Sequence, residues 1–400
     1  MSGNATRLGT ANTYDNAVRQ ITSRQSQLAT LQEQLTAGKK VLRPSDDPTG
    51  AAQAERAITR MARVATDQRA LEVQRNAVAT AESTLGAAMT AVQTFRTLAV
   101  QAGNTSLTAA DRANLAQQMT TLRDQILAYA NEKDSNGQPL FGGLGSTAAP
   151  FTDTAGGVTY DGIAGQPASG TLSVAATLDG HATWMNVPTG NGVFAITQAT
   201  GTAGVYSDAG KVTDPSAVTG NDYSIVFGVN AGVTTYSVLD TTSGSTVLSA
   251  RPYVSGQAIA FDGISLTASG TPADGDALRV KPSTTTSLFG VLDSAIAGIR
   301  DATGSAAVGQ AVAQSLAQID AGISRLQASR GTAGDLLNRV DDISGRQDDR
   351  SIQLEADRSR AEDMDMVKGL SDFQNQQTAY TAALGTYAQI QRQSLFNYIG

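Results

Sequence analysis

Apolar side chains near both ends of the chain recur at alternating steps of three and four residues, which is the spacing of a coiled-coil seam. Near the C-terminus Gln377 and Gln391 fill two positions of this repeat, and the apolar residues of the stretch are Met366, Leu370, Phe373, Tyr380, Leu384, Tyr387 and Leu395. Near the N-terminus Gln25 interrupts the same spacing, whose apolar members are Tyr14, Val18, Ile21, Leu28, Leu31 and Leu35. Because isolated helices are marginal in water, we expect the two ends to pack together.

Turn-forming residues end the N-terminal helix. Gly38 suits the left-handed position that follows a helix C-terminus. In the segment Pro44-Ser45-Asp46-Asp47-Pro48, Asp47 can cap a new helix and Pro48 can occupy its first turn without losing a needed hydrogen bond. The sequence therefore predicts a hinge between two helices here.

Long helices are also predicted in the part of the chain that follows this hinge. Apolar residues repeat every seven positions from 64 to 99, which predicts one helix from Pro48 to about Ala102, and a third helix after position 106 should form an antiparallel hairpin with it. Helical periodicity returns at Leu288 and continues on one seam to position 340. That seam does not run in register into the C-terminal one, so a second hinge is predicted near 361–365, where Asp363 or Asp365 can cap the last helix.

Between positions 150 and 287 the pattern changes to short alternating runs that are divided by Asp-Gly and Pro-Ser turn signals. This pattern predicts a β sandwich or an open barrel. The predicted fold class is α+β multidomain, with a long coiled-coil-like α-helical bundle from both chain termini and an inserted all-β domain. Its parts are terminal helices at 1–43 and 363–400, which we expect to be disordered in the monomer and to serve assembly, an inner α-helical bundle at 44–149 and 288–362, and the β insert at 150–287.

Charge is distributed unevenly along the chain. Lys and Arg against Asp and Glu number 15 and 12 in residues 1–150, 4 and 10 in 151–287, and 10 and 14 in 288–400. The opposite signs of the two flanks favour docking of one on the other. The net charge of −7 and the lack of a basic patch argue against nucleic-acid binding.

Other compositional features exclude further classes. The chain has no Cys, which rules out disulfides and thiolate metal sites. It shows neither a Sec-type signal sequence nor a run of about 18 apolar residues, so we expect export by another route and no membrane insertion.

No residue pattern indicates an enzyme or a cofactor. His181 is the only histidine and has no second metal-binding residue nearby, so it is interpreted as a surface loop residue. The pair Asp46-Asp47 is explained by capping, and Gly142-Gly143-Leu144-Gly145 lacks the context of a phosphate loop and is interpreted as a flexible joint. The acidic pairs at 341–342 and 348–349 indicate a solvated or intersubunit helix face.

The segment Gly38-Lys39-Lys40, the segment Pro44-Ser45-Asp46-Asp47-Pro48 and the heptads at both ends together resemble the bacterial flagellin family and its hook-associated relatives. The segment at 136–143 and the ending at 394–399 favour a hook-associated member. The resemblance covers the first 140 and the last 110 residues and is expected to be absent from the β insert. The family's usual start resembles Arg7-Leu8-Gly9-Thr10, which leaves residues 1–6 as an extra lead.

The resemblance implies a secreted structural protein of the extracellular bacterial flagellum that is exported through the flagellar type III channel. It implies assembly in a short, ring-like layer of copies between a junction protein of the hook-associated protein 1 type and the flagellin filament, and a chaperone that shields the C-terminal helix. Two alternatives remain: a flagellin filament subunit, or a surface adhesin or hydrolase whose activity lies in the β insert.

Overall fold

A computed structural model describes residues 10–399, apart from positions 105, 147, 200, 201, 203 and 303, and leaves undescribed the side chains of 10–13, 390 and 392–399. The start at positions 7–9 that resembles the family, and the lead before it, lie outside these residues. The chain forms two compact units, one made of the residues up to Arg69 and from Ser344 onward, the other of Ala70–Ile343.

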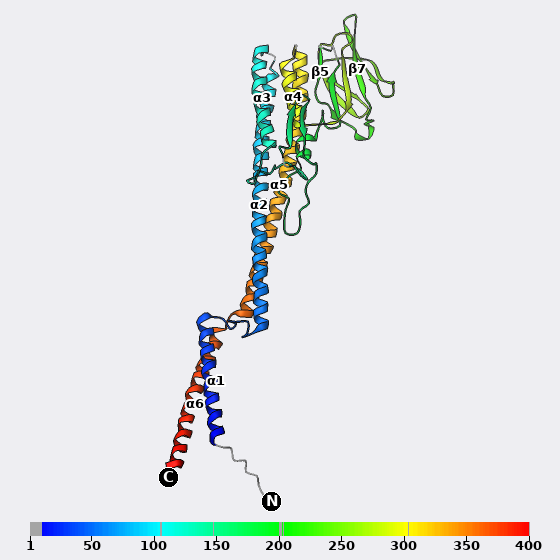
Figure 1. The fold of residues 1–400 in the computed structure, drawn as a ribbon. Coiled ribbons are helices and arrows are strands. Elements are labelled where there is room, and N and C mark those ends of the chain that lie inside the picture. The colour runs from blue at the N-terminus through cyan, green and yellow to red at the C-terminus, as the bar shows by residue number, and fades with distance from the viewer. Residues whose placement is uncertain are drawn as a thin grey trace. The chain divides into compact units, whose positions relative to one another are not determined.

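The first unit contains the terminal helices α1 (Thr10–Ala37) and α6 (Met366–Ile399), which lie side by side (Figure 1). It also contains the first part of α2 (Pro48–Ala102) and the last part of α5 (Ser305–Glu362). Small residues let these two helices approach closely: a Cβ added to Gly50 would lie 3.1 Å from the carbonyl oxygen of Ala361. Gly38 has the predicted left-handed conformation, with φ of 68°.

The second unit holds the rest of α2 and α5 together with α3 (Ala109–Ala130) and α4 (Leu288–Arg300). Helix α3 starts with a capping box, in which the Thr108 hydroxyl accepts a bond from the Asp111 amide and the Asp111 carboxylate accepts one from the Thr108 amide. The predicted helix from 288 onward is two helices. Gly304, which has φ of 96°, lies between them and is incompatible with a continuous helix.

The hydrophobic core of these helices also contains residues that were predicted to belong to the β insert. The hairpin β1 (Phe151–Thr154) and β2 (Gly157–Tyr160), the short π-helix η1 (His181–Met185) and the pair β3 (Val187–Pro188) and β13 (Thr285–Thr286) lie against it. Trp184 is fully buried there and its ring stacks on Phe289 of α4, with centroids 6.0 Å apart. The separate β core therefore starts about 40 residues later than position 150.

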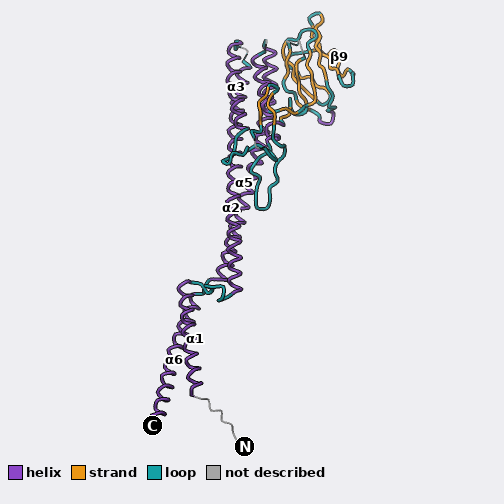
Figure 2. Tube along the Cα trace, viewed as in Figure 1, coloured by secondary structure: helices purple, strands orange, loops and turns teal. Residues whose placement is uncertain are grey.

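Two antiparallel sheets form the β domain (Figure 2). One has the order β4-β12-β7-β8-β9, with bounds Phe194–Gln198, Ala277–Pro282, Tyr223–Asn230, Val233–Asp240 and Thr246–Pro252. The other contains β10 (Ala258–Phe261), β11 (Ile264–Gly270), β5 (Val205–Ser207) and β6 (Lys211–Val212), and a 3-10 turn, η2, spans Pro215–Ala217. Side chains of both sheets, including Phe227 and Leu266, share one hydrophobic core, so the domain is a sandwich.

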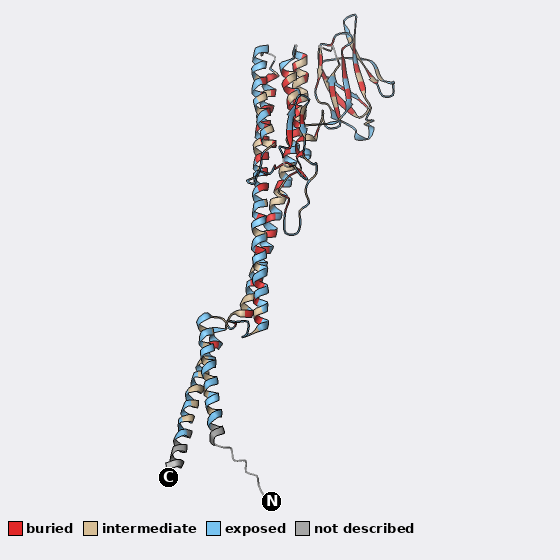
Figure 3. Cartoon of the chain, viewed as in Figure 1, coloured by how far each residue is buried: buried red, intermediate tan, exposed pale blue. Residues whose placement is uncertain are grey.

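Burial differs strongly between the two units (Figure 3). In the helices of the second unit, large side chains such as Phe95 and Phe289 are completely buried. In α1 and α6 the side chains are mostly exposed or half-buried. No helix among the described residues is long and apolar enough to cross a membrane.

Candidate assembly surface

Helices α1 and α6 contact each other along a narrow stripe. Phe373 and Tyr380 of α6 and Leu28 of α1 are half-buried on this stripe. Gly369 is buried on the stripe and marks a close approach, because a Cβ there would lie 3.2 Å from Leu35. The half-buried positions of α1 from Ala17 onward are Ala17, Ile21, Arg24, Leu28, Leu31, Gln34 and Leu35, and those of α6 are Phe373, Gln376, Ala379, Tyr380, Ala383 and Tyr387.

The seam residues that were predicted as one stripe therefore form two sets. Ile21, Leu28, Leu31, Leu35, Phe373, Tyr380 and Tyr387 lie in the α1–α6 contact, and so does Tyr14, which is 45% exposed but meets Tyr387. The other members are exposed, with 39–52% of their surface open: Val18, Met366, Leu370 and Leu384. Val367, which the sequence pattern did not single out, is 82% exposed. The side chain of Leu395 lies outside the described part. Two helices alone cover only one narrow stripe of each other, so Met366, Leu370 and Leu384, at the edge of this stripe, stay exposed in the described part of the chain.

The two predicted hinges lie against each other as one corner, which is formed by residues 38–48 and 360–366. The backbone of Lys39 pairs with that of Asp363 as an antiparallel bridge. The amide of Lys40 donates to the carbonyl of Glu362 at 2.8 Å, and the amide of Met364 donates to the carbonyl of Gly38 at 2.9 Å. These backbone bonds tie the start of α6 to the end of α1, so the corner is more constrained than a free hinge.

Each capping residue in the corner has a definite partner. Asp46 accepts bonds from the amides of Leu42 and Arg43, at 3.1 and 2.9 Å, which closes the turn that contains Pro44. Asp47 accepts a bond from the amide of Thr49 at 3.0 Å, and Pro48 is the first residue of α2.

Asp365 caps the start of α6. Its carboxylate accepts bonds from the amides of Val367 and Lys368, at 3.0 and 3.1 Å. Of the two caps that the sequence allowed, Asp365 caps the helix and Asp363 pairs through its backbone.

Ion pairs reinforce the corner. Lys39 bonds to the carboxylate of Glu362, which also accepts a bond from Arg358 at 3.1 Å. Arg358 bonds in addition to Glu355, and this hydrogen bond lowers the pKa of the Glu355 carboxyl. The contacts join the end of α5 to the turn after α1 through half-buried charges.

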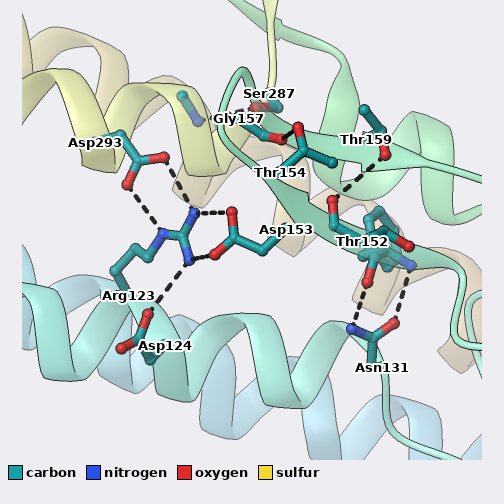
Figure 4. Close-up of polar contacts among 12 residues, drawn as sticks. Arg123, Asp124, Asn131, Thr152, Asp153, Thr154, Gly157, Thr159, Ser287 and Asp293 are labelled. Atoms are coloured by element: carbon teal, nitrogen blue, oxygen red, sulfur yellow. Dashed lines mark hydrogen bonds and ion pairs between the residues drawn. The ribbon is translucent and has the colours of Figure 1, made fainter.

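A second charged cluster lies in the other unit and was not found from the sequence (Figure 4). Arg123 of α3 is 6% exposed and bonds to Asp293 of α4 at 2.9 Å, to Asp153 of β1 and to its neighbour Asp124. The hydrogen bonds that Arg123 donates to Asp153 lower the pKa of the Asp153 carboxyl and raise the pKa of Arg123. The cluster clamps α3, α4 and the β1–β2 hairpin together, which is a structural role.

The remaining candidate positions have structural surroundings. His181 is exposed at the start of η1, with its ring 5.9 Å from that of Tyr160. No group of three His, Cys, Asp or Glu residues that could hold a metal is found among the described residues. The predicted flexible joint at 142–145 is wrong: Gly142 and Gly143 are buried, and Gly143 donates to the carbonyl of Leu178 at 3.0 Å. A Cβ at Gly143 would collide with the carbonyl oxygen of Ile163, so glycine is required by packing.

Both the helical and the β regions match known families. Residues 9–146 match the bacterial flagellin N-terminal helical region, and residues 196–282 match the D2-like domain of flagellar hook-associated protein 1. The expectation that the family resemblance would be absent from the β insert is therefore wrong. Short alternating strands carry a weak pattern, so this likeness could not be read from periodicity.

Relatives with known names agree with the helical match. Flagellar hook-associated protein 3 of Salmonella typhimurium is 38% identical over 153 residues, which are 38% of this chain and 48% of that protein. Flagellin of Clostridium tyrobutyricum is 28% identical over 129 residues, which are 32% of this chain and 34% of that protein. The chain thus spans about half the length of the curated hook-associated relatives it matches.

Structural similarity extends over more of the chain. The crystal structure of flagellar hook-associated protein 3 from Legionella pneumophila superimposes with a TM-score of 0.69 and 29% sequence identity, covering 76% of this chain and 97% of that one. The resemblance to the flagellin-like family is therefore confirmed, with flagellar hook-associated protein 3 as the member to which both the sequence and the structure of this chain are similar.

Proposed function

We propose that the chain is a structural subunit of the bacterial flagellum that assembles in a short layer at the junction between the hook and the filament. The observation that carries this proposal is the row of apolar side chains that α1 leaves exposed on α6, at Met366, Leu370 and Leu384. An exposed apolar stripe on a long helix is typical of a surface that is buried on assembly. The similarity to hook-associated protein 3 along nearly the whole of its crystal structure supports the same role.

The partners follow from this position in the flagellum. On the hook side the layer meets a junction protein of the hook-associated protein 1 type, and on the other side it meets flagellin. The subunit reaches the cell exterior through the flagellar export channel. Before export, a chaperone covers the C-terminal helix, whose apolar face would otherwise associate in the cytoplasm.

Deleting the gene tests the role directly. Cells that lack the chain should build hooks, fail to retain filaments and release flagellin monomers into the medium, because filament subunits then have no layer on which to start. The measurements are electron microscopy of the cell surface and immunoblotting of flagellin in cell and medium fractions. Full filaments on the deleted cells would refute the proposal.

A filament subunit is the second candidate, and the 28% identity to a flagellin over 129 residues favours it. The same strain separates the two roles. If the chain is the filament subunit, deleted cells carry hooks with no filament and release no other flagellin, because the main filament protein itself is missing.

A further inference from the structure

The corner carries an apolar groove that the capping and hinge roles do not explain. The groove has a volume of about 480 Å³ and is bounded by the turn after α1 and the first turns of α2. Most of its lining residues are apolar, among them Leu42, Pro44 and Ile58, and its charged ones are Arg43, Glu55 and Glu362. Ile58 of α2 is 42% exposed, whereas the preceding residue, Ala57, is buried. Such a groove on a rigid corner is suited to receive aliphatic side chains.

The same unit has a row of exposed apolar side chains, called the protrusion here, that could fill such a groove. Met366, Val367 and Leu370 lie on the first turns of α6, where they are 51%, 82% and 52% exposed. The bonds of the Asp365 cap and the bridge at Lys39 hold this helix start in a fixed position. Because these side chains are exposed, they do not fill the groove of their own chain.

Charges beside the two surfaces are complementary. Among the charged lining residues, Arg43 pairs with Glu33, and Glu362 pairs with Lys39 and Arg358. Glu55 is the remaining charge of the groove, and Lys368 lies within the protrusion. In the described part of the chain, neither side chain has an oppositely charged partner within 4.0 Å. An incoming helix start that places its apolar residues in the groove would therefore bring a lysine towards a glutamate, which favours this pairing over a random apolar contact.

We propose that the groove at Ile58 receives the start of α6, at Met366, Val367 and Leu370, from a second copy of this chain. The inference rests on the proposed function and specifies how its subunits contact one another. Groove and protrusion are different surfaces of one chain, so the contact is heterologous and each copy offers one of each. Such a contact propagates sideways and produces a closed layer when the rotation between copies closes.

Cross-linking of introduced cysteines tests the contact, since the natural chain has none. A deletion strain co-produces two differently tagged full-length chains, one with Ile58→Cys and the other with Val367→Cys. Flagella are sheared from the cells and oxidised, and tagged dimers are measured on non-reducing gels. The matched control replaces Ile58→Cys with Ile352→Cys, a position that is 69% exposed in the same unit. Immunoblotting for both tags in the sheared material shows independently whether the chains have assembled.

We expect the Ile58→Cys and Val367→Cys pair to yield on the order of tenfold more mixed dimer than the control pair, because a docked contact raises the effective thiol concentration. If both tags are present in the sheared flagella and the two pairs give equal yields, the contact is wrong and the proposed junction role stands. If neither tag is found in flagella although deletion leaves filaments intact, both proposals are wrong.

Discussion

Tyr14 of α1 and Tyr387 of α6 meet through their hydroxyl groups, whose oxygens are 2.6 Å apart, and their ring centroids are 5.4 Å apart. At the other end of the same two helices, Lys39 bonds to Glu362 beside the start of α6. Next to this ion pair the amide of Met364 donates to the carbonyl of Gly38, so α1 and α6 are tied together at both ends. Between them the contact consists mainly of half-buried residues, so the register is well specified although the pairing buries little apolar surface.

The terminal helices should therefore open readily in the free chain. We predict that backbone amides of α1 and α6 exchange with solvent much faster than those of residues 70–343 when the purified chain is dilute, because few buried contacts protect them. Assembly should then protect them. Hydrogen exchange followed by mass spectrometry of monomer and of sheared flagella measures both states, and strong protection of α1 and α6 in the dilute monomer would contradict the prediction.

Leu384→Asp tests whether the exposed face of α6 serves assembly. Leu384 is 41% exposed, so the charge should leave the free chain almost as stable as before. In the assembled layer the carboxylate would lose its hydration without a partner, at a cost of several kcal/mol per subunit. We expect normal thermal unfolding and failed incorporation into flagella.

Thr386→Asp is the matched control for this change. It adds the same charge to an exposed polar position two residues away. Normal incorporation of Leu384→Asp, or equal failure of both variants, would show that the Leu384 face is not an interface.

The Arg123 cluster predicts a dependence of stability on acid. The bond from Arg123 lowers the pKa of Asp153, so its contribution to the free energy of unfolding is complete above the ordinary carboxyl value of about 4 and is lost as the pH falls through the lowered value. Because Asp153 is 44% exposed, removing it should cost only about 1 kcal/mol. Asp153→Asn should thus be less stable than the natural chain at pH 7 and equal to it near pH 2.

Denaturant unfolding between pH 2 and 7 measures this difference. Asp124→Asn serves as the control, because Asp124 is 65% exposed and makes a single bond of 3.3 Å to Arg123. A constant deficit of Asp153→Asn across the whole pH range would mean that packing, and not the charge, explains the loss.

Local chemistry made the corner predictable from the sequence. Gly38 and Pro48 act through their own backbone, and Asp47 acts on an amide two residues away, so their spacing alone located the ends of α1 and α2. The choice between Asp363 and Asp365 as the cap depended on the path of the chain across the corner, which no local pattern contains.

Features that depend on contacts between distant segments of the chain could not be predicted from the sequence. Arg123 meets Asp153 and Asp293 from segments 30 and 170 residues away, and nothing in the periodicity of α3 marks it. The covered and the exposed residues of the α6 seam could not be separated, because both are apolar and a helix pair covers only part of the seam. Trp184 falls within the range 150–287 that was predicted as the β insert, but packing places it against Phe289.

The β domain should unfold independently, since its core is separate from that of the helices. Phe227→Ala removes a fully buried ring from the sandwich and should cost about 3–5 kcal/mol there. We expect calorimetry to show an additional transition at lower temperature, while the helical signal in circular dichroism melts as in the natural chain. A single transition that shifts as a whole would mean that sandwich and helices unfold together.

Self-association of the purified chain decides between a junction and a filament subunit. A filament subunit adds to its own kind without limit, whereas a junction subunit must meet different proteins on its two axial sides and stop after one short layer. Exposed polar residues interrupt the apolar seams of α1 and α6, at Gln25, Gln377 and Gln391, and weaken the packing of one copy on another. We predict that the chain stays monomeric or forms only small oligomers at tens of micromolar in sedimentation velocity. Long helical fibres formed by the pure chain would instead favour a filament subunit.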